Sequence, residues 1–513
     1  MVSAVLFITF FVLLVLNVPI AVCLGLSSAA AILYSGTSLT IVATNIYSGI
    51  SKFLLLAIPF FVLSGNIMAK AGISTRLIRF VDTCVGHRKG GIANVCIIVA
   101  CFFGAISGSG PATVAALGAV LIPAMVERGG FSAAFSTALM ATSSSIAIVI
   151  PPSIAFVVYA SITGVSIGDM FMAGIIPGIL MGLALVVVVM LEVRRNHVVP
   201  SNVEKASAKE RWNAFKDAFW GFLMPIIILG GIYGGFFTPT EAAAVSVVYG
   251  LFVGMVIYKE VKFKDLWEIL IDSAKTTGGI MLIVACASLF SFVCTRFGIS
   301  TAASELLARV ASNQFTFLLI CNIIFLIAGC FIDANSAMYI FIPIMLPVCK
   351  ALGYNVIAFG IMATVNLAIG QVTPPVGVNL FVAIGIKLRD GIRVTLQEIS
   401  RAVVPMVAAS IAVLLIITYI PQISTCLPAA LGSAAAIEND ETVGGDSGTT
   451  QTDNDDFNTI GDYSDLDWAD MTWNFTCSTT ETSTWAQAGR KFGELMEQAT
   501  GGKVKVDVYA ADQ

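Results

Sequence analysis

Long apolar runs separated by short polar segments make up most of residues 1–421. A helix needs about 20 apolar residues to cross the hydrocarbon core of a bilayer, and these runs lack the strict alternation of transmembrane barrel strands. The chain is therefore expected to be an all-α polytopic membrane protein. The predicted apolar segments are 4–33, 54–69, 93–106, 114–125, 133–160, 171–191, 219–237, 242–258, 278–295, 315–332, 337–349, 356–386 and 402–421.

The stretch GAISGSGPAT, residues 104–113, is polar and rich in helix breakers, although apolar runs flank it. Non-helical backbone survives at membrane depth only inside protein or beside a water-filled cavity. We predict a re-entrant helical hairpin with its tip here, because glycine permits the turn and Pro111 suits the first turn of the returning helix. Hydroxyls and freed backbone oxygens at this tip are candidate Na⁺ ligands: Ser107, Gly108 and Ser109.

A second interruption, GCFIDANSAMYIF at residues 329–341, carries the one carboxylate placed well inside an apolar stretch, Asp333. Ionisable groups within the membrane usually belong to functional sites. Asp333 and Asn335 are candidate Na⁺ ligands, with Ser336 beside them; alternatively, Asp333 carries a proton. The structural alternative is that Asp333 caps the second arm of a hairpin.

Two proline pairs, Pro151-Pro152 and Pro374-Pro375, stand in the middle of runs that would otherwise form continuous helices. Each proline removes a backbone donor and clashes with the preceding turn, so we predict two discontinuous helices. A simple kink at each pair is the alternative. Polar or flexible residues around the breaks are further candidate Na⁺ ligands: Ser153, Thr373 and Gly377.

The chain contains an internal repeat. AKAGIS at 69–74 matches TRFGIS at 295–300, an offset of 226 residues, and two later matches follow at offsets of 224 and 223. Five full crossings, an odd number, separate the two repeat starts, so repeat one (about 54–191) and repeat two (about 280–421) are expected to be inverted. Inverted repeats with broken helices are typical of secondary transporters, whose ligands lie where the repeats meet.

Helix starts at the two hairpins and the two breaks are expected to point at one cavity. Each helix start carries roughly +0.5 of a charge, so the cavity suits an anion such as a carboxylate. We expect no Lys or Arg deep in a span. The candidate substrate-binding residues are Pro111, Ala112, Thr113, Ser145, Pro151, Pro152, Ser336, Pro374 and Asn379.

Loop charges predict the orientation. If the first run crosses once from the cytoplasm, one set of loops holds 20 Lys or Arg, and the opposite set, up to residue 432, holds four. The basic set comprises 70–89, 126–130, 192–216, 259–275 and 387–401. Basic loops gather on the cytoplasmic side, so we expect a cytoplasmic N-terminus and a periplasmic C-terminal tail.

The composition changes at about residue 431. Residues 1–432 carry 24 basic and 16 acidic side chains, whereas 433–513 carry 4 and 16. We predict a membrane domain over 1–430, a disordered acidic linker over 431–470 and a short α/β segment over 471–513. That segment reads as a strand in MTWNFTCS, a helix in STWAQAGRKFGELMEQATGG and a strand in KVKVDVYA.

No enzyme class fits these motifs. An ATP-driven pump is excluded because GSGPATVAALG lacks the lysine of a phosphate loop. A rhomboid-type serine protease is excluded because both histidines, His87 and His197, lie in expected cytoplasmic loops. An intramembrane aspartyl protease is excluded because Asp333 has no second carboxylate within the membrane. The eleven cysteines show no zinc spacing, and neither half of the chain looks like a nucleic-acid binder. A passive organic-anion channel is the alternative to a transporter.

Several of these stretches together resemble the large membrane subunit of TRAP transporters, the tripartite ATP-independent periplasmic family. They are GAISGSGPATVAALGAVLIPAM, ATSSSIAIVIPPS, GGFFTPTEAAAV, AGCFIDANSAMYIFIPIMLP and GQVTPPVGVNLFV. The resemblance implies an elevator-type, Na⁺-coupled symporter of the bacterial inner membrane that imports an organic acid, commonly a C4-dicarboxylate or sialic acid.

The resemblance also implies partners. These are a periplasmic substrate-binding protein and a small four-helix membrane subunit, surrounded by membrane lipids, with no cofactor besides Na⁺ as the coupling ion. Residues 483–513 resemble the start of such a binding protein. We therefore expect 471–513 to be the truncated beginning of a fused substrate-binding domain; the alternative is a short tail that is functional by itself.

Overall fold

The computed structural model describes residues 1–16, 18–195, 205–310, 313–386, 394–432, 471–477, 491–492, 496–497 and 504–510. The chain divides into two compact units, Met1–Val443 and Gly444–Gln513. Every element described in the first unit is a helix, and among the described residues nine helices are long and apolar enough to cross a membrane. The predicted all-α polytopic architecture is confirmed for this unit.

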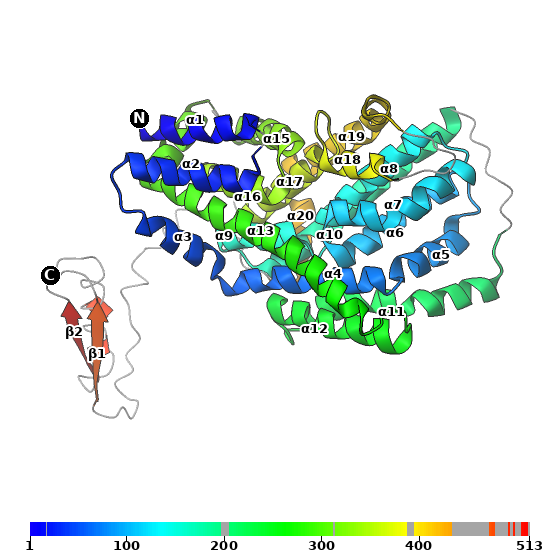
Figure 1. The fold of residues 1–513 in the computed structure, drawn as a ribbon, viewed down its shortest axis with the longest axis horizontal. Helices are drawn as coiled ribbons and strands as arrows, with labels where there is room; N and C mark the ends of the chain where they lie inside the picture. Colours follow the sequence, from blue (N-terminus) through cyan, green and yellow to red (C-terminus); the bar gives the residue numbers. More distant parts are fainter. Residues whose placement is uncertain are drawn as a thin grey trace, which may run out of the picture. The chain divides into compact units, whose positions relative to one another are not determined.

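The first apolar run folds into two helices instead of one span. Helices α1 (Val2–Val15) and α2 (Ile20–Tyr34) run in opposite directions and pack side by side (Figure 1). Pro19 precedes α2 in an extended conformation, as expected for a residue that cannot lie inside a helix. At 1.5 Å per residue each helix is about 21–23 Å long, shorter than the roughly 30 Å hydrocarbon core. The single crossing expected over 4–33 is therefore wrong.

This fold-back changes the argument for the side on which the N-terminus lies. Met1 and the connection that follows α2 are at the same end of the helix pair (Figure 1). That connection leads through α3 (Thr40–Ile50) to Lys52, which the loop charges place on the outer side. The cytoplasmic N-terminus stays a prediction, and a fold-back without a crossing would place Met1 on the outer side instead.

Repeat one contains seven helices, and its core is a pair of short arms followed by a broken helix. Its first helix continues directly from a 3₁₀ turn, Phe53–Leu56. The helices are α4 (Ala57–Lys70), α5 (Ile73–Val85), α6 (Gly91–Ser107), α7 (Gly110–Glu127), α8 (Ala133–Ser145, extended by a 3₁₀ turn at Ile146–Ile148), α9 (Ile154–Thr163) and α10 (Ile167–Arg195).

Repeat two presents the same series in the same order. After one long helix come a short helix, two hairpin arms, a broken helix and a long final span, and the short α20 (Gln422–Ala430) follows. The helices are α13 (Asp265–Arg296), α14 (Ile299–Val310), α15 (Gln314–Phe331), α16 (Ala334–Ala351), α17 (Val356–Gly370), α18 (Val378–Ile384) and α19 (Leu396–Tyr419). Both predicted hairpins and both predicted helix breaks are present.

Two helices connect the repeats: α11 (Ala208–Tyr233) and α12 (Pro239–Phe252, continued by a π-helical turn at Val253–Ile257). Each begins with a capping box, formed by Ser207 with Glu210 and by Thr238 with Glu241. Such reciprocal bonds satisfy free N–H groups at a helix start, so both helices have well-defined beginnings.

The broken helices α8 and α17 form the centre of the unit. All residues from Phe135 to Ser145 and from Ile357 to Gly370 are buried, whichever way they face. A helix that is buried on all sides is a core helix. The two chain breaks that follow these helices therefore start from the interior and not from the lipid-facing surface.

The second unit contains a two-stranded parallel sheet, β1 (Met471–Cys477) and β2 (Val504–Ala510), paired from Met471 with Val504 to Cys477 with Ala510. Both strands were predicted. Parallel neighbours require a crossover connection, and the helix predicted between them lies mostly outside the described residues. The acidic linker predicted over 431–470 also lies outside them, apart from its first two residues.

The fold-back of α1 on α2 generates a topology prediction. A protease-sensitive tag placed before Met1 should be cut when protease is added to intact spheroplasts, whereas the same tag inserted at 87–89, in the basic connection between α5 and α6, should be cut only after lysis. Protection of the Met1 tag in intact spheroplasts would restore the cytoplasmic N-terminus.

Candidate functional site

The first hairpin turns at a glycine in a left-handed conformation. Helix α6 ends at Gly108 (φ 60°), and α7 starts after Ser109, which is extended. The Ser107 and Thr113 hydroxyls lie 2.9 Å apart, and Thr113 Oγ1 also donates to the Ser109 carbonyl at 2.8 Å. These bonds hold the two arms together at the tip.

The first helix break lies directly against this tip. A Cβ atom on Gly108 would lie 2.8 Å from the Pro152 carbonyl oxygen, and one on Gly104 would lie 2.6 Å from the Ala147 Cα. Ser153, fully buried, donates to the Ile148 carbonyl that the break leaves free. The structure thus brings hairpin one and the Pro151-Pro152 break together, as predicted.

The second hairpin turns at Asp333, which caps α16. Asp333 Oδ2 accepts hydrogen bonds from the Asn335 and Ser336 N–H groups, both at 3.1 Å, and Oδ1 accepts one from Ser336 Oγ at 2.5 Å. The capping alternative is therefore confirmed. Cation binding by the same carboxylate is compatible with capping and stays a prediction.

The second break runs from Gln371 to Gly377, where a left-handed glycine (φ 60°) starts α18. Thr373 Oγ1 donates to the Ile369 carbonyl at 2.7 Å, and the Asn379 N–H donates to the Gln371 carbonyl at 3.0 Å. The break is thus an ordered turn that hydrogen bonds hold in place.

Backbone contact joins this break to hairpin two. A Cβ atom on Gly370 would lie 2.5 Å from the Gly329 Cα, and the Gly377 N–H donates to the Cys330 carbonyl at 3.3 Å. Side chains at either glycine would separate the two segments. The pairing of hairpin two with the Thr373 to Asn379 break is therefore also as predicted.

A contact between the repeats at the tip of hairpin one was not predicted. A Cβ atom on Gly110, in hairpin one, would lie 2.8 Å from Asn379 Nδ2 and 3.1 Å from Gln371 Oε1, both in repeat two. Asn379 is fully buried, and neither of its amide atoms has a hydrogen-bond partner among the described residues. Gln371 is 6% exposed, and its Oε1 also lacks a partner there.

A cavity of about 360 Å³ lies where these parts meet, a size within the range of small-molecule sites. Both hairpin tips, both breaks and the long helix α13 contribute to its wall. Hairpin one supplies 108–111, hairpin two supplies 333–335, the first break supplies Ile148, Ile154 and Ala155, the second supplies Gln371, and α13 supplies Lys275, Thr276, Gly279, Ile280 and Ile283. Helices α7 and α16 both start at this cavity.

The predicted site residues fall into three groups. Five line the cavity: Gly108, Ser109, Pro111, Asp333 and Asn335. Most others lie in the tips or breaks behind this wall: Ser107, Thr113, Pro151, Pro152, Ser153, Ser336, Thr373, Pro374, Gly377 and Asn379. Two do not fit: Ala112 is exposed and not part of the wall, and Ser145 is inside α8, where it donates to the Thr142 carbonyl at 2.8 Å.

Gln371 and the α13 residues were not predicted. Gln371 is an amide two residues before Thr373 in an apolar run, which is the one signal that marks it. Lys275 was assigned to a loop because the apolar run begins at 278, whereas α13 begins at Asp265. Lys275 lies ten residues inside the helix, about 15 Å along its axis. Helix α13 is about 48 Å long, more than the roughly 30 Å hydrocarbon core, so the expectation of no basic residue deep in a span stays a prediction.

Cation ligands at this site must be oxygen atoms. Among the described residues, no three His, Cys, Asp or Glu side chains cluster as a transition-metal site would require. Hydroxyl, amide, carboxylate and backbone oxygens are what the tips and breaks offer, and hard cations take such ligands. The residues present therefore fit a hard cation such as Na⁺.

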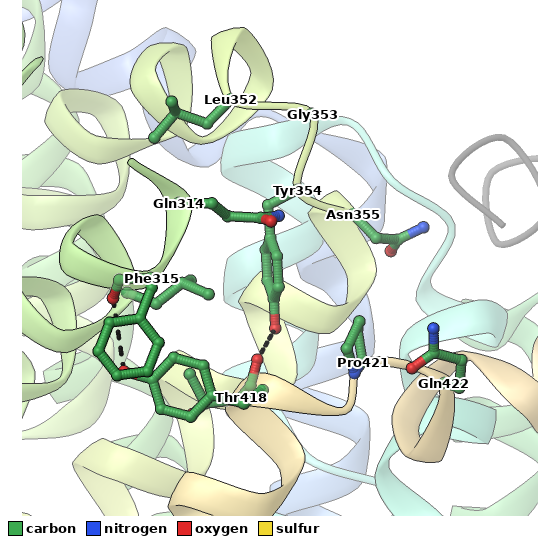
Figure 2. Close-up of a pocket in the computed structure, with 11 residues that line it drawn as sticks. Gln314, Phe315, Leu352, Gly353, Tyr354, Asn355, Thr418, Pro421 and Gln422 are labelled. Atoms are coloured by element: carbon green, nitrogen blue, oxygen red, sulfur yellow. Dashed lines mark hydrogen bonds between the residues drawn. The ribbon is translucent and has the colours of Figure 1, made fainter. Parts of the chain in front are cut away.

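A second, larger cavity of about 710 Å³ shares no lining residue with the first. Figure 2 shows it between the start of α15, the connection from α16 to α17, and the end of α19. The Phe315 and Tyr419 rings stack at 4.5 Å, and the Tyr354 hydroxyl donates to the Thr418 carbonyl at 2.8 Å. By the loop-charge argument this end of the helices is the outer one.

Two inverted sets of hairpin and broken helix that meet at one cavity define a secondary transporter. The family model described as "Tripartite ATP-independent periplasmic transporter, DctM component" matches residues 7–423, and the chain belongs to this family. It is the large permease component of a TRAP transporter, as the sequence resemblance indicated.

Known relatives cover most of the chain. The C4-dicarboxylate TRAP transporter large permease protein DctM of Rhodobacter capsulatus is 38% identical over 436 residues, which cover 82% of this chain and 97% of that protein. The isethionate TRAP transporter permease protein DctMQ of Oleidesulfovibrio alaskensis is 40% identical over 420 residues, 82% of this chain and 65% of that longer protein.

Among solved structures, the YdaH transporter of Alcanivorax borkumensis superimposes with a TM-score of 0.54 at 15% identity, covering 76% of this chain and 88% of that one. At this identity the likeness concerns the fold alone. It agrees with the predicted fold class of inverted repeats with hairpins and broken helices.

The close approach of hairpin two and its break predicts a packing-sensitive position. Gly370→Ala should destabilise the protein by about 1–3 kcal/mol or more, because its methyl group would overlap the Gly329 backbone. Thermal unfolding of the purified protein measures this.

The matched control for that substitution is Gly230→Ala in α11, where nothing lies within 4 Å of an added Cβ. Alanine is the better helix former by about 1 kcal/mol, so the control should unfold at the same or a higher temperature. Equal unfolding temperatures for both variants would contradict the close packing.

Proposed function

We propose that this permease imports an organic acid by symport with Na⁺. The observation that carries the proposal is the cavity in which both hairpin tips, both helix breaks and two helix N-termini meet. Inverted repeats are typical of transporters that expose one central site to either side of the membrane in turn.

The proposed cation sites are one for each repeat. Ser107, Gly108, Ser109 and Ser153 form the first, since the tip of hairpin one lies against the first break. Asp333, Asn335, Thr373 and Gly377 form the second. Support for the second comes from Asp333, which lines the cavity, and from Asn335 Oδ1, which has no hydrogen-bond partner among the described residues.

The proposed substrate is an organic anion. The positive ends of α7 and α16 face the cavity, and an anion is stabilised at helix N-termini. The relatives named above are named for C4-dicarboxylates and for isethionate. A C4-dicarboxylate, sialic acid or a similar acid therefore fits the site.

The mechanism we propose is an elevator, in which the hairpins and broken helices move together against a stationary scaffold. Helix α13 packs against α2, α3 and α4, which lie outside the hairpin and break elements and are the candidate scaffold. Each net positive charge that moves inward across 100 mV contributes roughly 2.3 kcal/mol, and a Na⁺ gradient adds to it.

We further propose that the permease works with two partners, a small membrane subunit and a periplasmic substrate-binding protein. The DctMQ relative extends well beyond the region matched by this chain. The parallel β1 and β2 pair fits the start of an α/β substrate-binding domain, as the tail resemblance implied. The cavity of Figure 2 lies on the expected outer end, where such a protein would arrive.

Reconstituted uptake tests the function. The complete complex in proteoliposomes should accumulate labelled succinate, isethionate or N-acetylneuraminate above the external concentration when an inward Na⁺ gradient is imposed, and the accumulation should collapse when the gradient is removed. Uptake that equilibrates without accumulating, whatever the Na⁺ gradient, would indicate a passive anion channel instead.

Asp333 separates the cation role from the capping role. Asn is as good an N-cap as Asp, so Asp333→Asn should fold normally yet raise the Na⁺ concentration for half-maximal uptake, roughly tenfold if one ligand contact is lost. Asp333→Ala removes the cap as well and should also lower the unfolding temperature, by the loss of about 1 kcal/mol.

Asn313→Ala is the control for that experiment, because Asn313 caps the other arm of the same hairpin by accepting from the Thr316 N–H. It should lower stability without changing the Na⁺ dependence. If Asp333→Asn keeps the wild-type Na⁺ dependence, Asp333 is a cap only.

A further inference from the structure

We infer that Lys275 of α13 binds the acid group of the transported substrate in the cavity that the hairpin tips also line. This inference rests on the proposed function and names a binding residue for it. Among the described residues that line the cavity, Lys275 is the one basic side chain and Asp333 the one acidic side chain.

Asp333 and Lys275 differ in how strongly they are already bound to other side chains and backbone groups of the protein. Asp333 accepts three hydrogen bonds within its own hairpin. Lys275 Nζ lies 3.7 Å from Asp272 Oδ1, too far for a good hydrogen bond, and both side chains are largely exposed, 74% and 61%. Exposed pairs of this kind hold each other weakly, so a substrate acid group can replace Asp272 as the partner of Lys275.

The helix surface around Lys275 leaves room for a ligand. Gly278 and Gly279 follow within one turn, and nothing lies within 4 Å of a Cβ built on either. Glycine weakens a helix interior, and close packing does not account for this pair. Gly279 also lines the cavity. The role that fits Gly278 and Gly279 is therefore to leave space for a ligand beside Lys275, because neither residue has a side chain.

The second helix break offers a second, independent sign of a ligand. Gln371, 94% buried, lines the same cavity with its Oε1 unpaired among the described residues, and it lies beside Gly110 at the start of α7. A substrate with an acid group at one end and polar atoms at the other would bridge the tips and Lys275. A Lys acts on such a group as a compact point charge with three donors.

The test is uptake kinetics in the complete complex, with succinate, isethionate and N-acetylneuraminate as probes under an inward Na⁺ gradient. For the probe that wild type accumulates, Lys275→Gln should raise KM about tenfold, as the loss of one modest charge contact would, and leave the Na⁺ concentration for half-maximal uptake unchanged. Lys275→Met should do the same, and Lys275→Arg should restore most of the lost affinity.

Lys264→Gln is the matched control, because Lys264, the residue directly before α13, stands about three turns before Lys275 and does not line the cavity. It should keep the wild-type KM. An unchanged KM in folded Lys275→Gln and Lys275→Met, or an equal rise in Lys264→Gln, would overturn the inference and leave the proposed function standing. If wild type accumulates none of the three probes, the proposed function fails and the inference with it.

Discussion

The arrangement of this protein depends on one constraint: a backbone N–H or carbonyl without a partner costs several kcal/mol in lipid. Four interruptions of membrane helices free such groups, at the two hairpin tips and at the two proline pairs. The two breaks follow directly on α8 and α17, which are buried on every side, and both hairpin tips line one cavity. Glycines at the contacts let backbone approach backbone, as between Gly329 and Gly370. The oxygen atoms that still face the cavity are then those that a ligand can use.

Contacts across the repeats turn two half-sites into one site. Each hairpin lies against the break of its own repeat, but Asn379 and Gln371 of repeat two also lie beside Gly110 of repeat one. Helix α18 packs against α7 and α8, which belong to repeat one. A ligand in the cavity therefore contacts groups whose positions depend on both repeats. Such sharing gives a physical basis for cations and substrate to affect each other's binding.

The sequence predicts the interruptions well because each is encoded by local chemistry. A left-handed glycine at Gly108, a capping carboxylate at Asp333 and paired prolines act on the backbone within a few residues. Contacts between distant segments have no such local cause, so the approach of Asn379 to Gly110 was not predictable. A hydropathy profile does not show whether the chain reverses its direction within an apolar run. The fold-back at Pro19 was therefore not predicted. Such a profile also marks only the apolar part of a helix, and the polar first turns of α13, with Lys275, therefore read as a loop.

Charge balance in the cavity connects the proposed cation sites with the proposed anion site. Lys275 and Asp333 are its basic and acidic lining residues among those described, and their formal charges cancel. A dicarboxylate that enters alone brings two negative charges into a site of low dielectric constant, which is unfavourable unless cations accompany it. One cation at each hairpin would restore neutrality. Because coupling between two ligands is reciprocal, each bound cation then strengthens binding of the anion, and the anion strengthens binding of each cation. In the proposed mechanism, the inverted repeat, which duplicates the hairpin and its break, would thereby provide two cation positions around one anion position.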